Sequence, residues 1–180
     1  MEIGATKAVQ DRLKTTKIEE SKGASLVFCW DTHLTKIKGR NVLFIVNASN
    51  RYTIAMTDIE PRNWNYYTMY IIRVIHGMMQ EMGYSEEHIG QYFKMSGDTT
   101  VTKTHGRKSV GGINRMVMDA QYFGKKLEKE AKYQWELSEY LNRDICQPEG
   151  FDAYGYPNEL FKLDMERLGI ATKRKPAKVI

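Results

Sequence analysis

The sequence predicts an α+β fold, with a mixed or antiparallel sheet, helices packed on one face of it and a C-terminal helical arm. Three observations lead to this prediction. Stretches rich in β-branched and aromatic residues gather in the first 60 residues, a helical pair and one returning strand follow, and the rest of the chain shows helix and loop patterns. The composition, 42% hydrophobic and 27% charged over 180 residues, is typical of a soluble globular protein.

The predicted strands come first. A short strand over 2–5 and a helix over 6–13 open the chain, and strands follow over 25–30 and 34–37 with a short break between them. Two further strands, over 42–46 and 52–56, are separated by five polar or small residues, a spacing that predicts a hairpin. Because the run from Val42 to Val46 is continuously apolar, we expect it to form a central strand covered on both faces.

Helical periodicity dominates the remainder. Pro61 opens a helix with apolar residues at three- and four-residue spacing, and Ser85 caps a second helix that ends at Gly97. The elements predicted after it are a strand over 98–104, a helix from 109 to about 143 with a break near 124, a loop over 147–157 and a last helix over 158–168.

We divide the chain into a core domain over 1–132 and a helical and loop extension over 133–180 that packs on it. The final segment, 171–180, is a basic tail with four of the 27 basic residues. Without that tail the chain is nearly neutral, so the net charge of +5 is only a weak indicator of nucleic-acid binding.

The first candidate site is a basic loop that leads into a helix. Lys103, Arg107, Lys108 and Arg115 surround a predicted helix start with Ser109 at the N-cap position, and free N–H groups at a helix start favour an anion. The spacing of glycines and lysine does not fit a P-loop. We therefore predict an anion or nucleic-acid site of general type, with a plain strand-to-helix connection as the alternative.

A second candidate is His33, which follows Asp31 closely enough for the carboxylate to orient its ring. Such a pair suits general base chemistry, but no nucleophile motif accompanies it, and a hydrogen-bonded structural histidine is the alternative. The sequence has neither a Cys-x-x-Cys nor a His-Glu-x-x-His motif. We therefore predict no metal site, no cofactor and no assigned catalytic residue.

The third candidate is a dense group of aromatic residues in the C-terminal extension. Aromatic side chains provide large rigid contact surfaces at protein interfaces, so these residues are predicted to bind a partner. The alternative is an arm that packs on its own domain. The predicted partner-binding residues are Tyr133, Trp135, Tyr140, Tyr154 and Tyr156.

The order of several motifs resembles an uncharacterised family of small bacterial and mobile-element proteins. The resemblance covers about residues 1–125 and is carried by Thr6-Lys7 to Leu13, Trp30 to Leu34, Val46-Asn47 and the turn from Lys103 to Asn114. Lys108 stands where that pattern has serine. The resemblance implies a fold but no activity. In size and in its helical arm, the chain also resembles phage-encoded anti-CRISPR inhibitor proteins.

These observations favour a non-catalytic binding or inhibitory protein that engages a protein or nucleoprotein partner, in its most specific form an anti-CRISPR-like inhibitor of an RNA-guided nuclease. The positive net charge argues against DNA mimicry. The alternatives are a small enzyme acting on a phosphorylated or anionic small molecule and a toxin-antitoxin or regulatory nucleic-acid-binding protein. The N-terminal residues lack a signal-peptide pattern and no apolar run is long enough to span a bilayer, so we expect a cytoplasmic protein without membrane contact.

Overall fold

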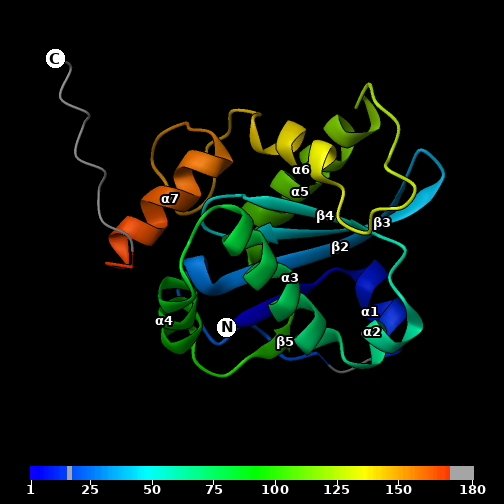
Figure 1. Cartoon of the computed structure of the whole chain (residues 1–180). Coiled ribbons are helices and arrows are strands. Elements are labelled where there is room, and N and C mark those ends of the chain that lie inside the picture. The colour runs from blue at the N-terminus through cyan, green and yellow to red at the C-terminus, as the bar shows by residue number, and fades with distance from the viewer. Residues whose placement is uncertain (16–17, 171–180) are drawn as a thin grey trace, which may run out of the picture.

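Five strands form one mixed sheet in the computed structural model of the chain, which describes residues 1–15 and 18–170 (Figure 1). The strand order is β4-β3-β2-β1-β5. β1 pairs in parallel with β2 and β5, whereas β2, β3 and β4 form an antiparallel meander. The strands are β1 Glu2–Ala5, β2 Cys29–Ile37, β3 Arg40–Asn47, β4 Thr53–Thr57 and β5 Thr100–Thr102. The predicted α+β class and mixed sheet are confirmed, whereas the predicted basic tail over 171–180 lies outside the described residues.

The predicted hairpin of β3 and β4 is confirmed, and its residues from Val42 to Val46 are buried on both faces. β2 is one continuous strand, in contrast to the predicted break after Trp30. Side chains alternate between the two faces of a strand, so Asp31 and His33 lie on one face while Trp30 and Thr32 lie on the other. These polar residues therefore do not interrupt the backbone pairing of β2 with β3.

Helices cover both faces of the sheet, so the prediction that they pack on one face is wrong. One face of β3 and β4, with Ile45 and Ile54, packs against α3, α4 and α7, and the other, with Phe44 and Ala55, packs against α5 and α6 (Figure 1). Consecutive apolar residues on these strands give both faces an apolar surface to bury. The helices are α1 Lys7–Leu13, α2 Pro61–Asn65, α3 Tyr67–Glu81, α4 Glu86–Ser96, α5 Gly106–Gln121, α6 Trp135–Asn142 and α7 Pro157–Arg167, with a 3₁₀ turn, η1, at Leu26–Phe28.

The helix predicted from 109 to about 143 begins earlier, at Gly106, and the predicted break near 124 falls in the irregular segment that separates α5 from α6. No helix within the described ranges combines the length and the apolar character needed to cross a membrane.

α6 covers the outer edge of β4. The Asn142 side chain accepts a hydrogen bond from the Thr53 N–H and donates one to the Thr53 carbonyl, both at 2.8 Å. The Ala55 N–H donates to the Ser138 hydroxyl at 3.0 Å. These side chains satisfy backbone groups that an edge strand would otherwise leave unpaired. Together with Phe161 of α7, which is fully buried in the core, they join α6 and α7 to the rest of the described chain.

Truncation of Phe44 to Ala is expected to reduce the free energy of unfolding by about 2 to 5 kcal/mol, because the ring is fully buried under α5 and α6. Met69 on α3 is 51% exposed, so Met69→Ala serves as the control and should change stability by less than about 0.5 kcal/mol. Urea unfolding measures both values. A loss below about 1 kcal/mol for the Phe44 variant would contradict the placement of β3 in the core.

Asn142→Ala should destabilise the protein by about 1 to 3 kcal/mol, because the buried N–H and carbonyl of Thr53 both lose their partner. Glu136→Ala, on the same helix but exposed, is the control and should be nearly neutral. Equal stabilities of the two variants in thermal unfolding would show that α6 does not complete the edge of β4.

Candidate functional site

The sheet face beneath α5 is polar along β1 and the first half of β2. Glu2 lies opposite Cys29 and Gly4 lies opposite Asp31 in the parallel register, so these four residues share one face. The side chains of Glu2, Cys29 and Asp31 are buried. Together with His105 and Ser109, which come from the start of α5, they form what we call the buried polar cluster.

His105 lies at the centre of the buried polar cluster. Its Nδ1 is 2.7 Å from Asp31 Oδ1 and its Nε2 is 3.0 Å from Glu2 Oε2. Only 2% of the His105 side chain is exposed. A charged imidazole can donate to both carboxylates at once, so the ring joins β1, β2 and α5.

Asp31 occupies the position that the sequence analysis gave to an external anion. The His105 N–H points at its carboxylate, 3.2 Å from Oδ1, and the Ser109 hydroxyl donates to it. The predicted capping role of Ser109 is wrong, because His105 is the N-cap of α5 and Ser109 lies within the helix. The first turn of α5 therefore binds an internal carboxylate.

The cluster shifts the protonation equilibria of its own members. Burial raises the pKa of Glu2, but hydrogen bonds from Ser21, the Lys22 N–H and His105 outweigh that effect and hold the pKa below its usual value. Burial lowers the pKa of His105, but hydrogen bonds and charge interactions with Asp31 and Cys29 outweigh that effect and raise the pKa to about 10. Both shifts favour a charged imidazolium between carboxylates.

Only glycine fits at position 4 of β1. A Cβ atom on Gly4 would lie 1.9 Å from Asp31 Oδ1 and 3.1 Å from His105 Nδ1. The absence of a side chain at this position allows the carboxylate and the imidazole to meet directly above the backbone of β1.

His33 does not pair with Asp31, which corrects the interaction suggested by the sequence. The His33 ring lies 3.2 Å from the Thr6 hydroxyl, while the Asp31 carboxylate is used by His105 and Ser109. Burial lowers the pKa of His33. The structure therefore agrees with the alternative of a hydrogen-bonded structural histidine.

The predicted basic residues lie on the outside of the same helix. Lys103 pairs with Glu20, Lys108 lies 3.8 Å from Glu149, and Arg115 lies 3.3 Å from Asp119. Arg107 is exposed and has no carboxylate partner among the residues that the structure describes. The cations thus face solvent, and Ser109 points the other way, into the buried polar cluster.

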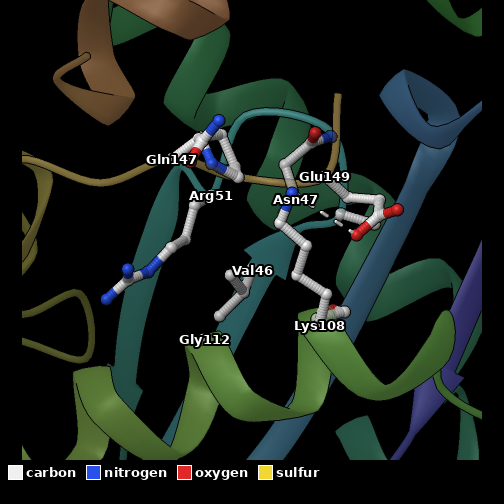
Figure 2. Close-up of a pocket in the computed structure, with 10 residues that line it drawn as sticks. Val46, Asn47, Arg51, Lys108, Gly112, Gln147 and Glu149 are labelled. Carbon is white, nitrogen blue, oxygen red and sulfur yellow. Dashed lines mark ion pairs between the residues drawn. The ribbon is translucent and has the colours of Figure 1, made fainter. Parts of the chain in front are cut away.

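A small pocket lies between α5, the end of β3 and the loop over 147–149. Figure 2 shows the Lys108 side chain extending from α5 toward Glu149, with Arg51 on the other side of Val46. The cavity volume is about 40 Å³, room for about three water molecules. Gly112 lies beside the aliphatic part of Arg51, whose Cδ would be 3.6 Å from a Cβ at that position, an ordinary van der Waals contact. The pocket brings Lys108 and Ser109 together but is too small for a substrate of metabolite size.

The predicted partner-binding aromatics separate into two groups. Tyr133 is half-buried against the main core and forms a β-bridge with Met56, so it presents little surface to a partner. The other four are exposed to 40–71% of their area, with Trp135 packing on Tyr133 and Tyr140 packing on Phe123. The exposed residues are Trp135, Tyr140, Tyr154 and Tyr156.

Sequence reasoning missed Glu2, Cys29 and His105 as partners. Their sequence separations are large, and no local spacing marks them. One signal was present: Glu2 lies inside a predicted strand and Asp31 directly follows another, and a carboxylate that becomes buried in a sheet needs a partner.

Comparison with known families gives one match. A family model described as a domain of unknown function, DUF6933, covers residues 2–160. The chain belongs to this family. No curated protein and no solved structure matches it. The predicted resemblance to an uncharacterised family is confirmed, and the DUF6933 match continues through residue 132, where we divided the chain. The likeness to anti-CRISPR inhibitors receives no support from these comparisons.

Replacement of His105 by Ala is expected to destabilise the protein by about 3 to 5 kcal/mol, because Glu2 and Asp31 would remain buried without their shared donor. His33→Ala is the matched control and removes a single contact with Thr6, so its cost should be near 1 kcal/mol. Denaturant unfolding compares the two. A His105 variant no less stable than the His33 variant would show that the cluster does not hold the fold together.

Proposed function

We propose that this DUF6933 protein is a non-catalytic binding protein that engages an anionic macromolecule through the outward face of α5 and the residues that flank it. The observation that carries the proposal is the charge distribution. Residues 103–126 contain six basic residues and one acidic residue, whereas the rest of the chain before 171 contains 17 basic and 21 acidic residues. All six cations are exposed: Lys103, Arg107, Lys108, Arg115, Lys125 and Lys126.

Exposed apolar side chains continue this basic face. Met118 of α5 and Tyr122, which directly follows the helix, are 60% and 79% exposed. Cations that contact phosphates, combined with aromatic side chains that stack on bases, are the usual means of binding single-stranded nucleic acid. The exposed Trp135 and Tyr140 add surface of the kind that protein partners contact. A nucleoprotein partner fits both features, and an RNA-guided nuclease is one specific example.

The burial of the polar cluster favours binding over catalysis. The Ser109 hydroxyl donates to Asp31, and both ring nitrogens of His105 contact carboxylates, so these buried groups satisfy one another's hydrogen bonds. Both cysteines are free thiols, which suits the cytoplasmic location that we include in this proposal.

The double variant Arg107→Ala with Lys108→Ala is expected to weaken binding to a fluorescent single-stranded RNA or DNA. The magnitude of the slope of log affinity against log salt concentration should fall by about 1 to 2, because binding that makes fewer phosphate contacts releases fewer counterions. Fluorescence anisotropy over a salt series measures this slope. The melting temperature should stay within a few degrees of the wild-type value, since both side chains are exposed.

The matched control is Arg73→Ala with Lys94→Ala, which removes two exposed cations from α3 and α4, on the other side of the sheet. This variant has the same net charge as the test variant but keeps the cations of α5. If the nucleic acid binds at α5, the control variant should bind it with nearly wild-type affinity. Equal losses in both variants would indicate only an effect of total charge, and unchanged affinity in the test variant would refute the α5 site.

Capture of partners from a host lysate, with and without nuclease treatment, tests the partner class. A partner lost on nuclease treatment and on mutation of Arg107 and Lys108 supports nucleic-acid contact. A partner that resists nuclease but is lost on mutation points to an acidic protein surface. Retention of every partner by the double variant would contradict the proposal.

A further inference from the structure

Three potential metal ligands of different chemistry meet inside the buried polar cluster. The carboxylate of Glu2, the Sγ of Cys29 and a ring nitrogen of His105 all lie within 4.8 Å of one another. They come from β1, β2 and the N-cap of α5. Cys29 is fully buried, and the side chains of Glu2 and His105 are only 5% and 2% exposed.

The imidazole is oriented as a metal-binding histidine usually is. Asp31 holds Nδ1 at 2.7 Å, which leaves Nε2 directed toward Glu2. A metal ion bound at Nε2 would take the place of the proton that this nitrogen otherwise donates to Glu2. Asp31 is held in turn by the Ser109 hydroxyl and the His105 N–H. A carboxylate behind the histidine, itself fixed by hydrogen bonds, is the common arrangement around protein zinc sites.

The charge in this enclosed space also favours a cation. Two carboxylates and a thiol face a single imidazole, so negative charge exceeds positive charge even when His105 is protonated. Within the described residues, no lysine or arginine side chain forms an ion pair with Glu2 or Asp31. Buried charges of this kind need a counter-charge.

We propose that Glu2, Cys29 and His105 bind one Zn²⁺ ion, with Asp31 as the positioning residue for the imidazole. A thiolate, an imidazole and a carboxylate together favour Zn²⁺ over Mg²⁺ or Ca²⁺. Ligand bonds of about 2.0 to 2.3 Å place tetrahedral ligand atoms about 3.3 to 3.8 Å apart. Because no two of the three ligand atoms are more than 4.8 Å apart, none of these separations needs to shorten by more than about 1 to 1.5 Å. The three protein ligands leave one position for water.

No metal site was predicted from the sequence, because the chain has no metal ligands at a fixed local spacing. Here the three ligands are 27 and 76 residues apart along the chain, and only the parallel pairing of β1 with β2 and the start of α5 bring them together. The proposal is independent of the anionic partner, since the cluster lies beneath α5 and the basic residues lie on its outer face.

The test uses full-length chain expressed in cultures supplemented with Zn²⁺ or Co²⁺ and then dialysed against metal-free buffer. Co²⁺ reports its own ligands, because a bound thiolate gives a charge-transfer absorption. Cys29→Ala removes the proposed thiolate. Cys146→Ala is the matched control, since Cys146 is also a free, buried thiol but lies outside the cluster.

Wild type and the Cys146 variant should retain one metal ion per chain and show the thiolate absorption. Both should unfold at a higher temperature with Zn²⁺ than with EDTA. Cys29→Ala should lose the absorption and bind Zn²⁺ at least about tenfold more weakly. Wild-type protein without bound metal and with the same melting temperature in Zn²⁺ and EDTA would overturn the proposal. A Cys29 variant that keeps the absorption would overturn it as well.

Asp31→Asn tests the positioning residue and decides the question if Cys29→Ala does not fold. The amide keeps the shape of the side chain but removes its charge from Nδ1. We expect it to lower Zn²⁺ affinity about 10 to 100-fold while the thiolate absorption of the Co²⁺ form remains. A purely structural Asp31 would change the melting temperature equally in Zn²⁺ and in EDTA, and unaltered affinity would contradict the site.

Discussion

The contact of the His105 imidazole with two buried carboxylates is the constraint on which the arrangement of this fold depends. Without a shared donor, the carboxylates of Glu2 on β1 and Asp31 on β2 would repel one another, and their burial would cost desolvation free energy. Among the residues that the structure describes, the start of α5 supplies this shared donor. The same interaction therefore fixes the approach of α5 to the sheet and the position from which its outer, basic face is displayed.

As a result, the two sides of α5 have different roles. Along its inner side, α5 contributes Ser109 to the buried polar cluster and Ile113 and Met116 to the apolar cluster under β3. Its outer side carries the cations. Because a helix repeats every 3.6 residues, neighbouring residues such as Lys108 and Ser109 point in different directions. The cations that the sequence grouped with Ser109 in one anion site thus face solvent, whereas the Ser109 hydroxyl donates to the buried Asp31.

The sequence predicted the individual strands and helices better than it predicted which face of the sheet each helix covers. The apolar run from Val42 to Val46 and the polar gap after it are local signals, and the β3-β4 hairpin followed from them. Whether α5 and α3 lie on the same face is not a local property. It depends on which face of the sheet each helix can bury, and the polar strip of Glu2, Cys29 and Asp31 becomes visible only once β1 pairs in parallel with β2.

For the same reason, the sequence predicted the exposed basic residues of the candidate site but not its buried polar cluster. Exposed cations are recognisable from composition, so Arg107 and Lys108 were identified as candidates in the sequence. A buried ionisable residue can be recognised as part of a site only when its partners are known, and the partners of His105 are 74 and 103 residues away along the chain. A carboxylate inside a predicted strand or directly after one is therefore a reason to look along the whole chain for its counter-charge. For this protein, that search leads from Glu2 and Asp31 to His105 and then to the neighbouring thiol of Cys29.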